Sequence, residues 1–275
     1  MSQDFSVLVS LYNGEREDFL EEALSSLTYQ SLRASEVIIV LDGFVRESLI
    51  QIIDSFKPYI NIKIVPLDQN YGLAKALKVG LLHCRFDLVA RMDTDDICEP
   101  NRFFEQVDFL IKNPDIDILG SNAKVIDDES LLTGDLSVPQ YDERIKEIIW
   151  TCPIIHPSVM FRKGKVISVG NYDEKLPKRQ EDYELWIRAS EQGLNFHNLQ
   201  ECLIKYRICR EANKKNNFSV GFNRLLIGWH SAWNSNYGLL AILAICYPMF
   251  RALIPSRLFR ITGRIFRRFD PRNKL

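Results

Sequence analysis

Three aspartates stand within four positions directly after a short apolar run, and this density of carboxylates is the feature most able to do chemistry. They are Asp93, Asp95 and Asp96, and the run before them spans residues 86–92. Negative charges this close together are costly unless a cation neutralises them. Carboxylate oxygens are hard ligands, so the expected ion is Mn²⁺ or Mg²⁺, usually shared with a diphosphate. A surface turn would use the same residues, but their place after a buried-looking strand favours the metal–diphosphate interpretation.

A second acidic pair, Glu181 and Asp182, opens a predicted helix over residues 181–192. A carboxylate separate from a metal site could act as the general base of a transfer reaction, opposite a diphosphate leaving group. An acidic first turn that complements the helix dipole explains the pair equally well from the local sequence. Two other residues, His156 and Trp186, have types that are more often structural than catalytic.

Polar residues also follow two other predicted strands. Tyr12 and Asn13 come after residues 5–11, and Asp42 comes after residues 36–41. In a parallel sheet, ligands bind outside the carboxyl ends of the strands. Each residue taken alone is typical of a turn. Together with the acidic cluster they predict a shared site, in which these side chains contact the base or ribose of a nucleotide.

The elements that must position these residues alternate in the first hundred residues. Apolar segments typical of strands occupy 5–11, 36–41, 60–65 and 86–92, and segments with helical spacing occupy 18–29, 46–56 and 72–84. This alternation predicts an α/β fold with a mostly parallel, Rossmann-like sheet flanked by helices. The second half is less regular, with helices predicted at 102–113, 142–150 and 181–192 and strands at 116–125, 156–161 and 202–209.

Composition limits the class of protein. The chain has 275 residues, 46% of them hydrophobic, and a net charge of −1, so it is long enough for one large domain and gives no indication of nucleic-acid binding. Its six cysteines form no C-x-x-C pair, which is typical of thiols in a reducing compartment. The N-terminus lacks a basic region followed by a long apolar stretch, so we expect a cytoplasmic protein.

The C-terminal segment differs from the rest in charge. Residues 251–275 contain eight Lys or Arg and one Asp, a local charge of +7, so the preceding 250 residues carry −8. The uncharged run 239–250 is shorter than the roughly 20 residues that span a bilayer. Over residues 257–269 arginines and apolar residues recur at helical spacing on opposite faces. This predicts a basic amphipathic helix at an anionic membrane surface, peripheral to the inner face of the cell membrane; a helix packed on the domain with a solvated Arg face is the alternative.

Six short motifs, in order, resemble those of family 2 glycosyltransferases of the GT-A fold, from about Phe5 to Tyr206. The resemblance is nearest to bacterial enzymes that build O-antigen, capsule or exopolysaccharide repeat units. The motifs are Tyr12-Asn13, Asp42, Asn70-x-Gly72-Leu73-Ala74, Asp93-x-Asp95-Asp96, His156-Pro157-Ser158-Val159 and Glu181-Asp182-x-x-Leu185-Trp186.

The resemblance implies a role for each matching residue. Asp182 would be the general base, and Asp95 would engage the metal and the diphosphate. The remaining residues would bind the nucleotide sugar (Tyr12, Asn13, Asp42 and Asp93) or shape the acceptor and donor pocket (Asp96, His156, Glu181 and Trp186).

The residue chemistry and the family resemblance together predict an inverting glycosyl transfer from a nucleotide sugar, most simply a UDP-sugar, to a lipid-linked saccharide acceptor. The expected domains are a GT-A domain over 1–210, with a nucleotide-sugar half of about 1–100 and an acceptor half of about 101–210, and a helical, basic C-terminal extension over 211–275. A sugar nucleotidyltransferase is one alternative, but the segment after the first strand lacks a Gly-rich, basic loop. A nucleotide-sugar-binding subunit without turnover is the other.

Overall fold

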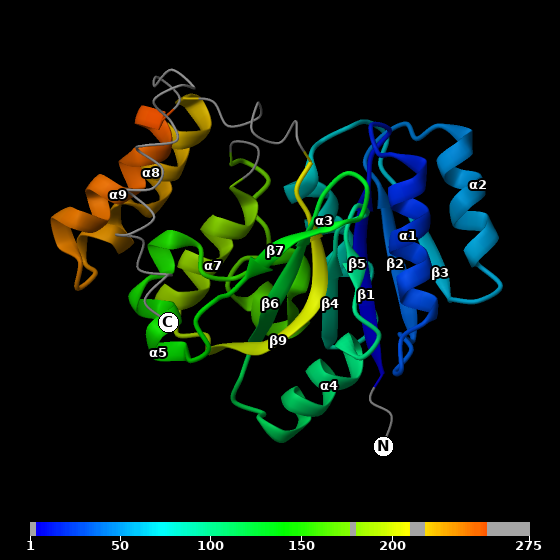
Figure 1. Ribbon diagram of the computed structural model, residues 1–275, viewed down its shortest axis with the longest axis horizontal. Helices are drawn as coiled ribbons and strands as arrows, with labels where there is room; N and C mark the ends of the chain where they lie inside the picture. The colour runs from blue at the N-terminus through cyan, green and yellow to red at the C-terminus, as the bar shows by residue number, and fades with distance from the viewer. Residues whose placement is uncertain (1–3, 177–179, 210–217, 252–275) are drawn as a thin grey trace.

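The computed structural model describes residues 4–176, 180–209 and 218–251 (Figure 1). Within them, one mixed sheet of nine strands extends through both halves of the chain, with helices on its two faces. The α/β prediction is therefore confirmed.

The N-terminal half forms the parallel part of the sheet, in the order β3-β2-β1-β4. The strands and the helices that connect them are β1 (Phe5–Leu11), α1 (Glu17–Thr28), β2 (Glu36–Leu41), α2 (Glu47–Phe56), β3 (Ile62–Pro66), α3 (Leu73–His83) and β4 (Leu88–Met92). In Figure 1 the carboxyl ends of these strands point towards the top of the molecule. The alternating pattern predicted this part of the fold nearly residue by residue.

The second half makes the sheet mixed. It continues as β4-β8-β6-β9-β5, where β8 is antiparallel to both its neighbours, β6 and β9 are parallel, and β5 is antiparallel to β9. Strand β7 pairs with β6 at the side. The elements are β5 (Ile97–Cys98), α4 (Arg102–Lys112), β6 (Ile118–Ile126), β7 (Leu132–Leu136), α5 (Asp142–Glu147), η1 (Ile149–Thr151), η2 (His156–Ser158), β8 (Met160–Arg162), α6 (Lys163–Ser168), α7 (Glu181–Glu191) and β9 (Phe196–Arg207).

Two predicted elements of this half need correction. The strand predicted over residues 156–161 begins as the 3₁₀ turn η2, and only Met160–Arg162 forms a strand. Pro157 explains the difference, because proline has no N–H to donate to a strand ladder. The last strand, predicted over 202–209, begins earlier, at Phe196, and ends at Arg207.

The core lies on both faces of the sheet because strand residues alternate in direction. Leu8 of β1 joins a cluster with α3 and α7, whereas Val7 and Val9 join a second cluster with α1, α2 and α4. The first cluster also includes Ala232 of α8 (Phe218–Trp233) and Ile245 of α9 (Gly238–Arg251). These two C-terminal helices pack side by side at the end of the molecule far from α2 (Figure 1).

Among the described residues no helix combines the length and apolarity needed to cross a membrane. The basic amphipathic helix predicted over 257–269 lies outside the described residues.

Candidate active site

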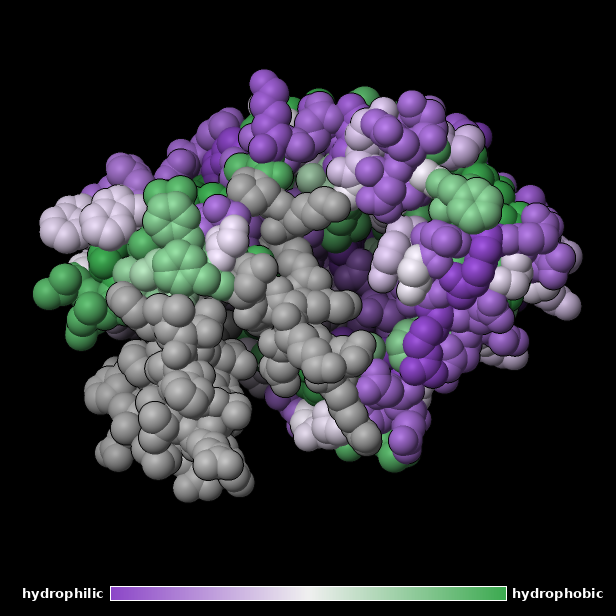
Figure 2. Space-filling view, turned by 90° about the horizontal axis from the view of Figure 1, so that it is seen from above, coloured by the Kyte–Doolittle hydropathy of each residue, from purple (hydrophilic) through white to green (hydrophobic). Residues whose placement is uncertain are grey.

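The acidic cluster is delivered by β4, as its sequence position predicted. Carboxylate oxygens of Asp93, Asp95 and Asp96 all lie within 4.8 Å of one another. They stand at the carboxyl end of β4, beside that of β1. Figure 2 looks onto this end of the molecule and shows a hollow lined by hydrophilic side chains.

The electrostatics of the cluster fit a divalent cation. Burial, the charge of Asp93 and the charge of Glu15 raise the pKa of Asp95 to about 7. Burial and both neighbouring aspartates raise the pKa of Asp96 well above its ordinary value. Oδ2 of Asp96 is buried and accepts no hydrogen bond from the described residues. A hard cation would satisfy that oxygen and the crowded charge, so this donor set suits Mg²⁺ or Mn²⁺.

One buried cation already faces the cluster. Arg91 is 1% exposed, and its guanidinium forms a two-pronged ion pair with Asp93, with both N–O distances at 2.5 Å. The single positive charge offsets part of the charge of three carboxylates. It also fixes the direction of the Asp93 side chain, because bidentate pairs restrain geometry.

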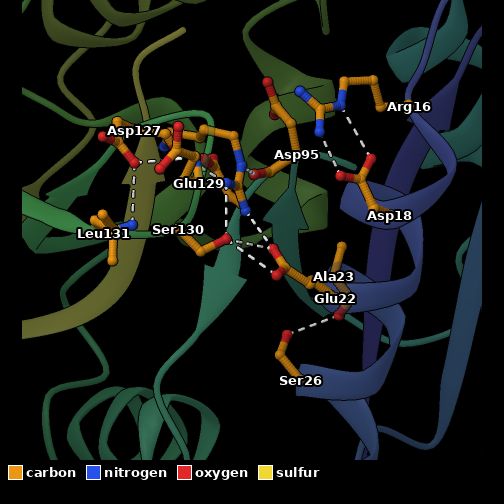
Figure 3. Close-up of polar contacts among 12 residues, drawn as sticks. Arg16, Asp18, Glu22, Ala23, Ser26, Asp95, Asp127, Glu129, Ser130 and Leu131 are labelled. Atoms are coloured by element: carbon orange, nitrogen blue, oxygen red, sulfur yellow. Dashed lines mark hydrogen bonds and ion pairs between the residues drawn. The ribbon is translucent and has the colours of Figure 1, made fainter.

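A second arginine, Arg207 at the end of β9, holds the backbone of the acidic loop. Its backbone N–H donates to Oδ1 of Asp96 at 2.8 Å, and its Nε donates to the carbonyl oxygen of Asp95 at 2.7 Å. Its terminal nitrogens bond to Glu22 of α1 and to Ser130 of the β6–β7 turn. Figure 3 shows Glu22, Ser130 and Asp95, which come from three different parts of the chain, in one neighbourhood.

The predicted nucleotide residues lie at the carboxyl ends of β1 and β2. Asp42 is buried, and its two carboxylate oxygens accept hydrogen bonds from the backbone N–H groups of Tyr71 and Gly72, at 2.8 and 2.9 Å. The carboxylate thereby shapes the loop before α3, where Gly72 has a φ of 95° that suits glycine. Asn13 accepts a hydrogen bond from the backbone of Arg46, and Tyr12 is about half exposed.

The second acidic pair opens α7, as predicted. Oδ1 of Asp182 accepts a hydrogen bond from the backbone N–H of Tyr183 at 2.8 Å, which orients the side chain. Oδ2 lies 3.8 Å from Sγ of Cys152. Glu181 is buried, and burial together with the charge of Asp182 raises its pKa.

Besides burial, charges from both acidic clusters contribute to the raised pKa of one tyrosine, Tyr206. Burial is the first cause of the raised pKa of Tyr206, and the charges of Asp96, Asp93, Asp95 and Asp182 follow. Charges at positions 93–96 and at 182 therefore lie near enough to one hydroxyl to disfavour its ionisation, although they are far apart in sequence. The fold brings the two clusters to one region.

His156 and Trp186 fill the interior behind this region. His156 is buried, its Nε2 lies 2.9 Å from the hydroxyl of Tyr172, and its ring meets Trp186 edge-to-face at 5.8 Å. Burial, and secondarily the charge of Arg91, hold the pKa of His156 well below its ordinary value. Nε1 of Trp186 has no partner among the described residues.

Sequence reasoning missed four residues that define the local electrostatics: Arg91, Arg207, Glu15 and Tyr206. Arg91 carried a usable signal, because it is the one charge within the apolar strand Leu88–Met92. Arg207 carried none, since its role depends on the pairing of β9 with a segment more than a hundred residues earlier.

Comparison with known proteins places this site in a family context. The family model described as Glycosyl transferase family 2 matches residues 6–170. The chain is 40% identical over 209 residues to the amylovoran biosynthesis glycosyltransferase AmsE of Erwinia amylovora, covering 74% of this chain and 76% of that protein. It is 35% identical over 281 residues to the UDP-Gal:alpha-D-GlcNAc-diphosphoundecaprenol beta-1,3-galactosyltransferase of Escherichia coli, covering 98% of this chain and 100% of that protein.

Solved structures show the same fold. A fragment of Staphylococcus aureus TarS in complex with UDP-GlcNAc superposes with a TM-score of 0.66 at 18% identity, over 94% of this chain and 73% of that one. The longer TarS structure also matches with a TM-score of 0.66, over 43% of its length. At this identity the likeness concerns the fold, a TarS-like GT-A architecture.

Proposed function

Because this chain belongs to glycosyl transferase family 2, we propose that it is an inverting, metal-dependent enzyme that transfers a sugar from a UDP-sugar to a lipid-linked saccharide. The observation that carries the proposal is the carboxylate cluster Asp93–Asp96 at the carboxyl end of β4, and the shared influence of this cluster and Asp182 on the pKa of Tyr206 supports a common site. The Escherichia coli relative, which aligns over nearly the whole chain, is named for a UDP-galactose donor and a diphosphoundecaprenol-linked acceptor. We extend that substrate class to this chain, in the biosynthesis of a bacterial surface polysaccharide.

Asp182 would act as the general base in this reaction. A sugar hydroxyl is a poor nucleophile at neutral pH, and a carboxylate within hydrogen-bond reach can accept its proton as the bond to the anomeric carbon forms. The bond from that carbon to the diphosphate breaks at the same time, and its electron pair leaves with the diphosphate oxygen. Attack opposite the leaving group inverts the anomeric centre. Oδ1 of Asp182 accepts a backbone hydrogen bond, and Oδ2, which faces the Cys152 thiol at 3.8 Å, would accept the proton.

The donor would bind along the carboxyl ends of β1, β2 and β4. We assign the nucleotide to Tyr12, Asn13, Asp42 and Asp93. Asp42 would act in part through the loop that its carboxylate holds. A divalent cation held by Asp95, with Asp96 nearby, would neutralise charge on the departing diphosphate.

The acceptor would approach from the other half of the domain. We assign the pocket on that side to His156, Glu181 and Trp186. In this scheme residues 1–100 bind the nucleotide sugar, 101–210 bind the acceptor, and 211–275 hold the enzyme at the cytoplasmic face of the membrane, where lipid-linked acceptors reside.

Replacement of Asp182 tests the base assignment. The Asp182→Asn variant should bind UDP with Mn²⁺ as the wild type does, since it lies outside the acidic cluster, and should lose transfer by about 10²–10⁴-fold. Transfer to a lipid-linked acceptor is measured by product analysis, and nucleotide binding by calorimetry.

Asp142→Asn is a matched control, because Asp142 also opens a short helix and accepts a backbone N–H, that of Phe196. It should transfer sugar at the normal rate. A normal rate in Asp182→Asn itself would refute the base assignment. Slow release of UDP from donor alone would separate an enzyme from a binding subunit without turnover.

A further inference from the structure

One face of α8 presents large apolar side chains to solvent. They recur every three or four residues, so they share one side of the helix. Phe218 stacks on Phe222, and Trp229 stacks on Trp233, with ring centroids 6.4 and 6.3 Å apart. Leu226 lies between the two pairs and is 61% exposed. We call these five residues the α8 apolar face.

The opposite side of α8 is firmly packed against the domain. Gly228 and Ala232 are buried there, and a Cβ on Gly228 would lie 1.8 Å from the hydroxyl of Tyr183. Arg224 stacks on the Tyr183 ring at 4.3 Å and donates a hydrogen bond to the carbonyl of Thr151. Helix α8 is therefore packed on the domain through one side, and the α8 apolar face is the side that remains exposed to solvent.

Helix α9 extends the exposed apolar surface. Leu239, Leu240 and Leu243 are each more than half exposed, while Ile242 and Ile245 of the same helix are buried. Figure 2 shows the apolar side chains of this end of the molecule in the same view as the hydrophilic hollow. Scattered exposed apolar residues are ordinary, but a contiguous patch of this kind marks an interaction surface.

Charge identifies the partner. Residues 212–269 contain no Asp or Glu and nine Lys or Arg, while the rest of the chain is acidic. A second copy of the chain would carry the same positive charge in this part of its sequence, which disfavours self-association. An anionic surface would instead be attracted to it, and lysines and arginines near such a surface favour binding by about 1 kcal/mol each.

We propose that the α8 apolar face and the exposed leucines of α9 form a membrane-docking surface for an anionic lipid bilayer. Tryptophan favours the boundary between headgroups and acyl chains, and an amphipathic helix lies in that plane with its apolar side inserted. The packed inner face of α8 fixes the orientation of the domain on the bilayer. The proposal deepens the proposed function and rests on it for the lipid-linked acceptor, which this docking would bring to the hollow.

Vesicle flotation of the full chain tests the surface. Wild-type protein should float with vesicles of equal parts phosphatidylglycerol and phosphatidylcholine. The double variant Trp229→Ser/Trp233→Ser should bind at least about tenfold more weakly, because two large side chains no longer leave water. The matched control is Phe104→Ser, which removes a half-exposed aromatic residue from α4 and should float as the wild type does.

Fluorescence of the wild-type protein gives a second measurement that needs no variant. Of its four tryptophans, Trp150 and Trp186 are buried, so lipids brominated on the acyl chains should quench only the emission of Trp229 and Trp233. Absence of quenching, or equal flotation of the double variant and the wild type, overturns the proposal. So does a wild-type dimer in solution that the double variant abolishes without any vesicle binding.

Neither readout uses sugar transfer. UDP release from a soluble donor should be unchanged in Trp229→Ser/Trp233→Ser, since neither residue belongs to the assigned donor site. Failure of docking with normal UDP release would overturn this inference and leave the proposed sugar transfer intact. Vesicle binding without any UDP release or sugar transfer would support this inference and overturn the proposed sugar transfer.

Discussion

Arg207 is enclosed completely, yet every part of its guanidinium has a partner. The side chain is 0% exposed, pairs with Glu22, bonds to the carbonyl oxygens of Asp95 and Asp127, and lies 4.0 Å from the Phe19 ring centroid. Because the side chain is enclosed, it has no surface with which to contact a diphosphate or an acceptor. It is a positioning residue, because it sets the backbone from which the aspartates project.

Replacing Arg207 by lysine should separate positioning from charge. Lysine keeps the positive charge but cannot form the forked set of bonds. We expect the affinity for UDP in the presence of Mn²⁺ to fall by about 10–100-fold, the usual cost of losing a partner behind a metal ligand. Calorimetric titration of folded protein measures it.

Arg162→Lys is the matched control for this prediction. Arg162 also bonds two carbonyl oxygens, those of Leu110 and Ile116, far from the acidic loop. It should lower stability and leave the UDP affinity unchanged. Equal losses of UDP affinity in both variants would show that Arg207 acts only through general stability.

The sequence predicts the aspartates of the acidic cluster, but it does not predict the contacts that Arg207 makes with the acidic loop. Asp93, Asp95 and Asp96 are adjacent in sequence and follow a strand, so a local pattern is enough to find them. The assembly around Arg207 depends on which strand lies beside which. Only the pairing of β5 with β9 determines that, and a two-residue strand such as Ile97–Cys98 has no periodicity to detect.

At the scale of elements, the turn η2 depends on a neutral histidine. The pKa of His156 is held well below its ordinary value by burial and by the charge of Arg91. The unfolded chain therefore binds a proton near pH 6.5 that the folded chain does not, so stability present above pH 6.5 is lost as the pH falls below it.

His156 should thus contribute a loss of up to about 1.4 kcal/mol per pH unit to the free energy of unfolding below pH 6.5. Asp95, Asp96 and Glu181 contribute with the opposite sign, because their raised pKa values make the folded chain bind protons that the unfolded chain does not. The test is therefore the difference between the wild type and His156→Gln in urea unfolding, which should change by that amount from pH 7 to 5. A difference that does not depend on pH would contradict the assignment.

The docking of α8 can be tested through its glycine. Gly228→Ala places a methyl group 1.8 Å from the Tyr183 hydroxyl, which is held by its hydrogen bond to the carbonyl of Trp150. Overpacking should lower the free energy of unfolding by roughly 1–3 kcal/mol, although alanine favours an isolated helix. Chemical unfolding measures the change.

Gly164→Ala provides the comparison within another helix, α6. Its nearest atom, Oδ1 of Asp87, lies at 3.4 Å, an ordinary contact. The variant should be as stable as the wild type or more so. If Gly228→Ala behaved the same way, the contact between α8 and α7 would not be tight.

Elements were predictable where their periodicity was sustained. Residues 1–100 alternate regularly between strands and helices, and the structure follows them closely. In the second half, β6 and β9 pair across about eighty residues, and β7 is an exposed strand with no apolar alternation. Local patterns carry no information on such distant pairing, which explains the error at residues 202–209. The error at 156–161 has a local cause, the missing N–H of Pro157.

For the whole molecule, one sheet runs through both halves of the chain, so a ligand held by the acidic cluster should stabilise the entire fold. At about a hundred times its Kd, UDP with Mn²⁺ should raise the unfolding temperature by roughly 5–10 °C. UDP with a chelator should not. Thermal unfolding measures both.

Asp95→Asn should lose most of that increase, because it removes a charged ligand from the cluster. Asp108→Asn should keep it, since Asp108 pairs with Lys112 on the surface of α4. A full increase in Asp95→Asn would exclude Asp95 as the metal-binding residue.

The long reach of the bond from Arg207 to Asp95 has a consequence for biosynthesis. The two residues are 112 positions apart, so the aspartates emerge from the ribosome well before the strand that fixes them has been translated. A nascent chain that has completed its first four strands and the acidic loop already contains Tyr12, Asn13, Asp42 and Asp93, to which we assign the nucleotide, but it lacks the strand that holds this loop. The chain should therefore become able to bind a donor only late in its synthesis, and a truncated product that ends before β9 should not bind it.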